Sequence, residues 1–190
     1  MNNIDYQQPS FYHFSEDSIL FSSYLRTLNL KNERVLELFA GSGVIGLEYS
    51  KDNASLKELH FLELQEEFLT CLKSNIQHFL SSKVKALIIN KSFHEHPCER
   101  YDLVICNPPY FETSSGRLPG NLKKRKCHFL DDSHFDLFIL KIKEYSLLGA
   151  SVFFLGRLDQ KWIQKYIADG TLKVLENFKK TSVFTLNKIH

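Results

Sequence analysis

The sequence has few cysteines and little excess charge of either sign, and both absences narrow the possibilities. Its four cysteines, at positions 71, 98, 106 and 127 of 190, form no Cys-x-x-Cys pair, so neither a zinc site nor a disulfide framework is indicated. Free thiols are typical of a reducing cytoplasm, and we expect a cytoplasmic protein without a metal. The formal net charge is only +2, so nucleic-acid binding could be argued only from a local basic patch.

Long apolar runs and targeting signals are also missing. No stretch approaches the ~18 apolar residues of a membrane-spanning helix, so we expect no membrane partner. The opening residues, MNNIDYQQPSFYHFSEDS, lack the basic and apolar regions of a secretory signal. No internal repeat or linker separates two domains. With 43% hydrophobic and 24% charged residues, the composition predicts a single globular domain over residues 1–190, with a monomer favoured.

The chain does contain a regular alternation of apolar strands and periodic helices. This alternation predicts a doubly wound α/β sheet of seven strands, mostly parallel and covered on both faces. A helical extension (1–32) precedes the first strand, and a basic loop (111–131) follows the fourth. We predict helices at 16–28, 44–52, 65–80, 132–148 and 159–170, and strands at 34–39, 58–64, 83–90, 101–106, 150–156, 172–178 and 182–189. Ligands of such sheets lie beyond the carboxyl ends of the strands.

A glycine-rich turn follows the first predicted strand. Residues 41–46, GSGVIG, fit the pattern G-x-G-x-x-G, whose glycines allow a tight turn and a close approach to a ligand. Glu63 ends the second strand 22 residues after Gly41, where a carboxylate can accept hydrogen bonds from ribose hydroxyls. Glu37 lies inside the first strand, where a dinucleotide domain normally has an apolar residue, and could face a cationic amino group. We therefore predict a nucleoside-type cofactor other than NAD; a purely structural turn is the alternative.

The fourth predicted strand ends on Asn107, Pro108, Pro109 and Tyr110. A residue before proline is held extended, so the Asn107 oxygen and the Pro108 carbonyl offer two neighbouring acceptors for an –NH2 group. Such acceptors would stabilise positive charge that develops on nitrogen as it attacks. Tyr110 could stack on a flat ring. The alternative is an ordinary Pro-Pro turn.

Together, ELFAGSG, FLEL and NPPY resemble motifs of the class I S-adenosylmethionine-dependent methyltransferases, the last being typical of those that methylate exocyclic or amide nitrogens. With HFSEDSILFSSYL before the first strand, the chain resembles the tRNA adenine-N6 methyltransferases over residues 12–160. These modify an adenine beside the anticodon of a valine tRNA. The resemblance implies S-adenosylmethionine as cofactor and an RNA as substrate, with a tRNA as the favoured kind. It assigns Asp17 and Ser18 to the methionine end of the cofactor and Glu63 to its ribose. Further cofactor-binding residues are expected at Glu37, Ala40, Gly41, Gly43, Leu64 and Asn107. The target adenine is assigned to Asn107, Pro108, Pro109 and Tyr110.

The sequence departs from that family at two places. The family commonly has an Asp after the third strand that binds the adenine amine of the cofactor, whereas this chain offers Ser92, so cofactor affinity could be lower. The family also carries an Arg-His pair after the NPPY motif. Here Arg125 and His128 are separated.

The loop after NPPY carries four consecutive cations, Lys123, Lys124, Arg125 and Lys126. We expect them to bind RNA phosphates, with Phe111 stacking on a splayed base. A solvated loop is the alternative.

Two other functions stay open. The same chemistry could act on a glutamine amide of a release factor, although such enzymes carry a helical domain before the glycine motif and only 33 residues precede Arg34 here. Alternatively, the chain could be a cofactor-free RNA-binding module on a decayed methyltransferase fold, which Ser92 slightly favours. DNA adenine methylation is disfavoured because no target-recognition domain is visible.

Overall fold

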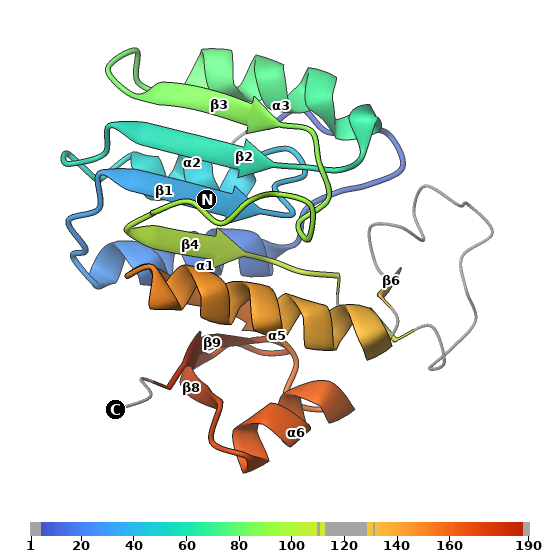
Figure 1. Cartoon of the computed structure of the whole chain (residues 1–190). Helices are drawn as coiled ribbons and strands as arrows, with labels where there is room; N and C mark the ends of the chain where they lie inside the picture. The colour runs from blue at the N-terminus through green and yellow to red at the C-terminus, as the bar shows by residue number, and fades with distance from the viewer. Residues whose placement is uncertain (1–4, 110, 113–128, 131, 188–190) are drawn as a thin grey trace.

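The computed structural model describes residues 5–109, 111–112, 129–130 and 132–187, and it confirms the predicted fold class. Seven strands form one sheet in the order β3-β2-β1-β4-β7-β9-β8 (Figure 1). The first five are parallel, and β9 runs antiparallel to both of its neighbours. Crossover helices keep successive strands parallel, whereas the final hairpin needs only a short turn.

Most predicted elements coincide with observed ones to within two residues at either end. The helices are α1 (Glu16–Thr27), α2 (Val44–Ser50), α3 (Glu66–Phe79), α5 (Asp132–Leu147) and α6 (Lys161–Ala168). The strands of the sheet are β1 (Arg34–Leu38), β2 (Glu58–Leu62), β3 (Lys85–Ile89), β4 (Leu103–Cys106), β7 (Ser151–Gly156), β8 (Leu172–Asn177) and β9 (Ser182–Leu186). Two short strands, β5 (Phe111–Glu112) and β6 (Phe129–Leu130), pair with each other.

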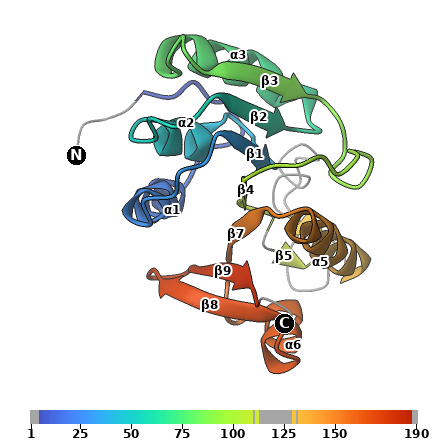
Figure 2. The same cartoon turned by 60° about the vertical axis from the view of Figure 1, so that its left-hand side comes forward.

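The sheet separates two apolar cores. Helices α1, α2 and α3 cover one face, and α5 covers the other (Figures 1 and 2). Because successive side chains of a strand point to opposite faces, Val35 of β1 enters the first core while Leu36 and Leu38 enter the second. The middle strands are therefore apolar on both faces, as their continuous hydrophobic runs predicted.

One polar residue interrupts this pattern in β1. Glu37 is 2% exposed, and its Oε2 accepts a hydrogen bond of 2.9 Å from the backbone N–H of Gly46 in α2. A Cβ atom on Gly46 would lie 2.5 Å from that oxygen and 3.3 Å from both Leu59 and Phe61. The third glycine of the motif is thus what allows α2 to pack closely on the sheet.

Burial also changes the acidity of Glu37. Desolvation raises its pKa to about 8, although the backbone N–H groups of Gly46 and Ile45 act in the opposite direction. The side chain is therefore largely protonated near neutral pH, and its buried oxygen acts mainly as a hydrogen-bond acceptor rather than as a full negative charge.

We predict that Gly46→Ala destabilises the fold. Alanine normally gains up to about 1 kcal/mol over glycine inside a helix, but here its Cβ would overlap Glu37 and crowd two core side chains, at a cost of about 1–3 kcal/mol. Chemical denaturation should show a lower midpoint with an unchanged slope. A midpoint above that of the wild type would contradict the close packing of α2.

We also predict that Glu37→Gln alters the pH dependence of stability. The native state retains the Glu37 proton up to a pKa of about 8, whereas the unfolded chain releases it near 4.5. Protonation thus stabilises the fold, and this contribution is lost as pH rises through that window, by up to about 1.4 kcal/mol per pH unit. Denaturation at a series of pH values should show a flatter profile for the variant.

Glu99→Gln provides a control of opposite sign. Arg34 lowers the pKa of Glu99, so the contribution of Glu99 to stability is present at neutral pH and is lost as pH falls. If stability depends on pH in the same way in the wild type and in Glu37→Gln, Glu37 is not buried and protonated as described.

Candidate active site

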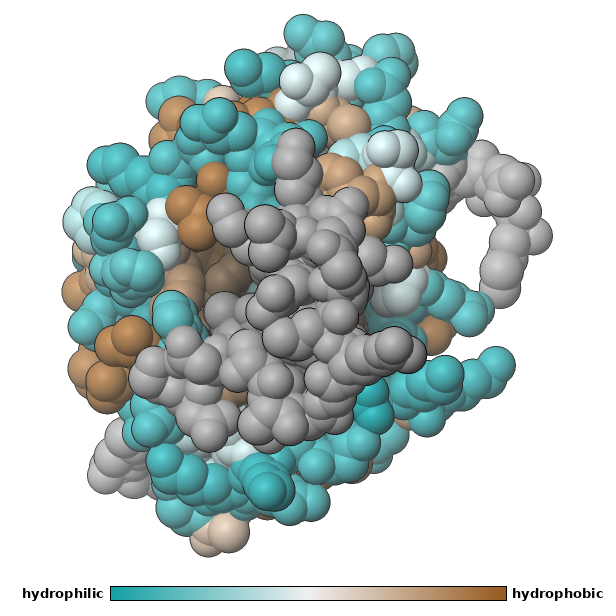
Figure 3. All heavy atoms as spheres, turned by 90° about the vertical axis from the view of Figure 1, so that its right-hand side faces the viewer, coloured by the Kyte–Doolittle hydropathy of each residue, from teal (hydrophilic) through white to brown (hydrophobic). Residues whose placement is uncertain are grey.

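Strand register brings the predicted site residues to one edge of the sheet. Leu38, the last residue of β1, pairs with Leu62 of β2 and Cys106 of β4, and Leu62 also pairs with Ile89 of β3. The segments that follow these strands hold the glycine turn, Glu63, Ser92 and Asn107. Figure 3 faces this carboxyl edge.

The turn between β1 and α2 depends on left-handed backbone conformations. Gly41 has φ 53° and Gly43, which caps α2, has φ 78°. A Cβ on Gly43 would lie 2.6 Å from Leu72 and 3.2 Å from Phe61, so this position needs glycine for space as well as conformation. Ala40 is buried beside them, and its carbonyl accepts the Gly43 N–H at 2.7 Å.

Phe39 was not identified as unusual from the sequence. It has φ 55°, a conformation that a bulky residue seldom adopts. Its ring packs on Phe93 and Phe138, with centroid distances of 5.1 Å and 6.0 Å. The aromatic contacts hold the strained residue in place and set the direction in which the chain leaves β1.

Glu63 holds the glycine turn from the end of β2. Its carboxylate is 6% exposed and accepts the Gly41 N–H at 2.7 Å and the Gln65 N–H at 2.8 Å. Burial raises the pKa of Glu63, while these backbone hydrogen bonds oppose the rise. Each carboxylate oxygen has a second lone pair, so the predicted role toward hydroxyl groups remains chemically available. Leu64 lies beside it and is 58% exposed.

The structure brings Ser18 and Asn107 together from positions 89 residues apart in the chain. The Asn107 Nδ2 atom donates to Ser18 Oγ at 3.4 Å. Ser18 lies in the first turn of α1 and is 3% exposed, whereas Asn107 and Asp17 are half-buried. Pro108 is buried. The N-terminal helix therefore contacts the end of the fourth strand of the predicted site.

Other predicted residues lie outside the described part of the chain. These are Tyr110, the cations Lys123, Lys124, Arg125 and Lys126, and the side chain of Phe111. Their roles stay predictions.

Ser92 has a close neighbour that the sequence did not indicate. Its buried hydroxyl lies 2.7 Å from Nδ1 of His94, which orients the hydroxyl at the end of β3. Asn90, which follows β3 directly, donates from Nδ2 to the carbonyls of Glu63 at 2.8 Å and Leu64 at 3.0 Å. Asn90 thus ties β3 to the end of β2, a role that its position after a strand could have suggested.

Asn75 of α3 was also missed. Its side chain is 1% exposed and donates to the carbonyl of Ser42 at 2.9 Å, within the glycine turn. Asn75 lies on the same face of α3 as Phe68 and Leu72, at i, i+4 and i+7 spacing. A polar residue on an otherwise apolar helix face was the available signal.

Two kinds of feature are absent from the described residues. Within those ranges, no helix is long and apolar enough to cross a membrane. Also within them, no group of three or more His, Cys, Asp or Glu side chains could hold a metal ion.

Two curated proteins illustrate the sequence similarity. The chain is 29% identical over 111 residues to the tRNA1(Val) (adenine(37)-N6)-methyltransferase of Aliivibrio salmonicida, covering 56% of this chain and 44% of that protein. It is 27% identical over 177 residues to the release factor glutamine methyltransferase of Flavobacterium psychrophilum, covering 84% of this chain and 56% of that protein. This chain therefore spans about half the length of these relatives.

Fold similarity and a family match extend these findings. The ribosomal protein L11 methylase of Lactobacillus delbrueckii subsp. bulgaricus superposes with a TM-score of 0.63 at 12% identity, covering 94% of this chain and 81% of that one. The family model described as Conserved hypothetical protein 95 matches residues 18–129, more than half of the sequence. The chain therefore belongs to the Conserved hypothetical protein 95 family, and its fold is that of the Rossmann-like methyltransferases.

Proposed function

We propose that this chain transfers a methyl group from S-adenosylmethionine to a planar amine nitrogen. The observation that carries the proposal is the contact between Ser18 and Asn107 at the edge where the glycine turn and Glu63 also lie. A cofactor-binding half and an amine-binding half predicted from separate motifs thus meet at one place. Relatives that methylate nitrogen in RNA or protein support the same reaction.

The residues around the turn fit a nucleoside-type cofactor. The Ser42 hydroxyl is buried and has no hydrogen-bond partner among the described residues, so a ligand at the turn could provide one. Gly41 leaves the turn without a side chain at its half-buried surface. Glu63 supplies acceptors for hydroxyl groups, and its two backbone hydrogen bonds fix its orientation.

Asn107 and Pro108 would act on the target nitrogen. The Asn107 Nδ2 atom donates to Ser18, while its amide oxygen and the Pro108 carbonyl would accept the two N–H groups of an amine. These hydrogen bonds would draw the nitrogen lone pair out of conjugation and stabilise the positive charge that develops on nitrogen. When bound, S-adenosylmethionine supplies a methyl group on an electrophilic sulfonium. The extra amine proton can leave to water afterwards.

We propose RNA, and an adenine N6 amine within it, as the substrate. Ser182, the first residue of β9, pairs with Gly156 at the end of β7, so the β8–β9 turn lies at the carboxyl edge too. Its two lysines, Lys179 and Lys180, are exposed, as is Lys161 at the start of α6. Phosphate groups are natural partners for such lysines.

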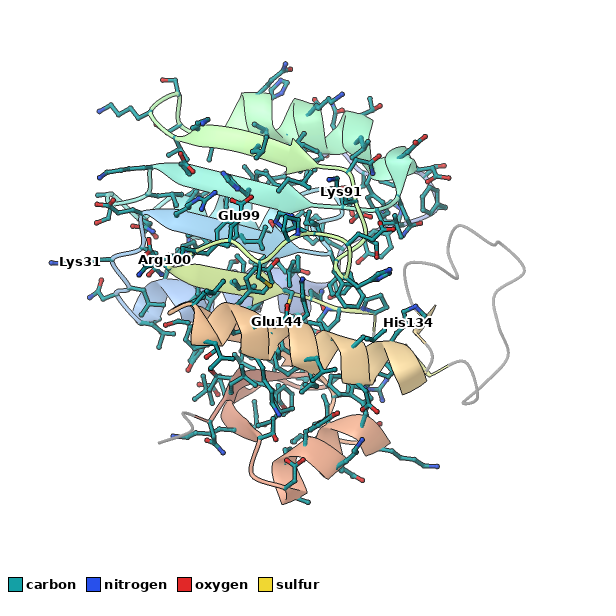
Figure 4. All side chains as sticks on the ribbon, viewed as in Figure 1. Lys31, Lys91, Glu99, Arg100, His134 and Glu144 are labelled. Atoms are coloured by element: carbon teal, nitrogen blue, oxygen red, sulfur yellow. The ribbon has the colours of Figure 1, made fainter. Side chains whose placement is uncertain are left out.

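Charge is divided along this edge. Beyond β7 the exposed lysines lie near the proposed amine site, while the exposed Glu66 and Glu67 follow β2 on the cofactor side. Exposed exceptions are Lys91, at the far border after β3 (Figure 4), and Asp159, which follows β7 and pairs with Arg157 at 2.7 Å. This division favours an anionic substrate that approaches from the β7–β9 side.

A glutamine amide in a protein is the second candidate. The relative that acts on a release factor matches 84% of this chain, and a carboxamide is also an –NH2 group on a trigonal carbon. The Asn107 and Pro108 acceptors suit both groups.

Mass spectrometry separates the two candidate substrates. RNA nucleosides and release-factor peptides would both be measured in cells with and without this protein. Loss of N6-methyladenosine supports the RNA assignment, and loss of methylglutamine overturns it.

We predict that Asn107→Ala lowers methyl transfer at least ~100-fold, because one of two acceptors of the developing charge is removed. S-adenosylmethionine binding, measured by calorimetry, should change little. The matched control is Asn177→Ala, which removes another asparagine at the same edge, where it accepts from Ser182 Oγ at 2.8 Å. Turnover that survives in Asn107→Ala would disprove the amine-binding role.

We also predict that Lys179→Ser/Lys180→Ser weakens RNA binding. Each phosphate contact to a single strand contributes about 0.7 to the slope of log affinity against log salt, so the slope should fall by about 1.4. Fluorescence anisotropy with a synthetic RNA hairpin bearing one loop adenine provides the measurement.

The matched control is Lys31→Ser/Lys83→Ser, which removes the same charge from exposed lysines at the opposite edge (Figure 4 labels Lys31). Equal salt slopes for the two double variants would attribute the effect to net charge and exclude a phosphate-binding turn.

A further inference from the structure

The N-terminal segment at residues 5–14, here called the strap, packs against the helices beside the glycine turn. The family match begins at residue 18, so the strap lies outside it. Tyr6 of the strap is 3% exposed, packs on Phe79 of α3 with a centroid distance of 4.4 Å, and donates to Glu48 of α2 at 2.7 Å. The strap is thus anchored on two helices before it continues into α1.

One side chain joins the strap to the glycine turn. Asn75 accepts the Gln7 N–H at 2.8 Å and donates to the Gln7 carbonyl at 3.0 Å. With its other N–H, the same amide donates to the Ser42 carbonyl at 2.9 Å. Both N–H groups and the oxygen of Asn75 are therefore used, and each of these bonds fixes the position of a backbone segment.

Aromatic contacts provide a second connection. The rings of Phe11 and Tyr12 meet Phe68 edge to face, at centroid distances of 5.8 Å and 5.4 Å. Phe68 in turn lies under the turn, because a Cβ on Gly41 would be 3.6 Å from its ring. The strap therefore supports the glycine turn both through a hydrogen-bonded amide and through a buried ring.

This support matters because the glycines of the turn are conformationally flexible. Gly41 and Gly43, on either side of Ser42, both have positive φ, and glycine moves between conformations more readily than other residues. Glu63 fixes the Gly41 N–H, but the carbonyl of Ser42 is fixed by Asn75. Without that donor the middle of the turn would be free to rotate about its flanking glycines.

We propose that Asn75 is a positioning residue for the cofactor. It sets the orientation of the Ser42 peptide against which the cofactor binds, and it makes cofactor affinity depend on attachment of the strap. This inference rests on the proposed function, since it concerns the same cofactor site. It requires no contact between Asn75 and the cofactor.

Calorimetry with S-adenosylmethionine on the full chain tests the proposal. Asn75→Ala removes all three hydrogen bonds, and we expect the dissociation constant to rise about tenfold. The kcat with RNA at saturating cofactor should fall less than about twofold, because the amine-binding groups are untouched. Loss of turn geometry would thus appear in cofactor binding rather than in the chemical step.

Hydrogen exchange gives a readout that does not depend on activity. In the wild type, we expect S-adenosylmethionine to slow exchange of the Gln7 amide as well as that of the turn, since the two are joined. In Asn75→Ala this protection of Gln7 should disappear. Gln7→Pro is the second variant: it removes the strap N–H that Asn75 accepts, replaces an exposed side chain and fixes the local φ, and it should also weaken cofactor binding.

The matched control is Asn32→Ala. Asn32 is 8% exposed and donates to the Tyr49 hydroxyl at 3.1 Å, far from the turn at the opposite edge. It should lower thermal stability without raising the cofactor dissociation constant. If Asn75→Ala and Asn32→Ala change cofactor binding equally, or if neither does, the inference is wrong while the proposed function stands. If the wild type binds no S-adenosylmethionine, both fall.

Discussion

Two buried glutamate side chains hold the backbone where β1 turns into α2, and the candidate site is arranged around them. Glu37 accepts the Gly46 N–H and Glu63 accepts the Gly41 N–H. The first N–H groups of a helix have no partner within it, so a turn built of glycines would otherwise leave polar groups buried without hydrogen bonds. The two carboxyl groups satisfy these N–H groups, and burial raises the pKa of each. The turn is therefore rigid although its glycines are individually permissive.

The glycine turn is the proposed cofactor side of the site. The proposed amine side, around Asn107, is held in place by different means. Asn107 follows a strand whose four residues are all buried, and Pro109 after Pro108 restricts the backbone further. Ser18 reaches this asparagine from α1, so two segments far apart in the chain define the place where a methyl donor and an amine would meet. A rigid scaffold of this kind favours catalysis by orientation, because the reacting groups need little rearrangement.

The similarity to relatives with RNA and protein substrates has a physical explanation. Under the proposed function, the shared part of the fold would hold the turn and the amine acceptors, whereas substrate choice would depend on surfaces outside it. In this chain we propose the exposed lysines of the β8–β9 turn and of α6 as one such surface. The strap provides another individual feature, because it lies before the matched region and is joined to the turn through Asn75.

The sequence by itself determined the order of strands and helices, the glycine turn, the acidic end of β2 and the Asn-Pro-Pro stretch, because these depend on local periodicity and on residues with special backbones. The tertiary structure decided which of them touch. Periodicity could place Glu37 inside a strand but not show that its carboxyl binds Gly46, nor pair Ser18 with Asn107 or Asn75 with Ser42. Those contacts join residues distant in the chain, and only packing of α1, α2 and α3 on the sheet brings them within hydrogen-bonding distance.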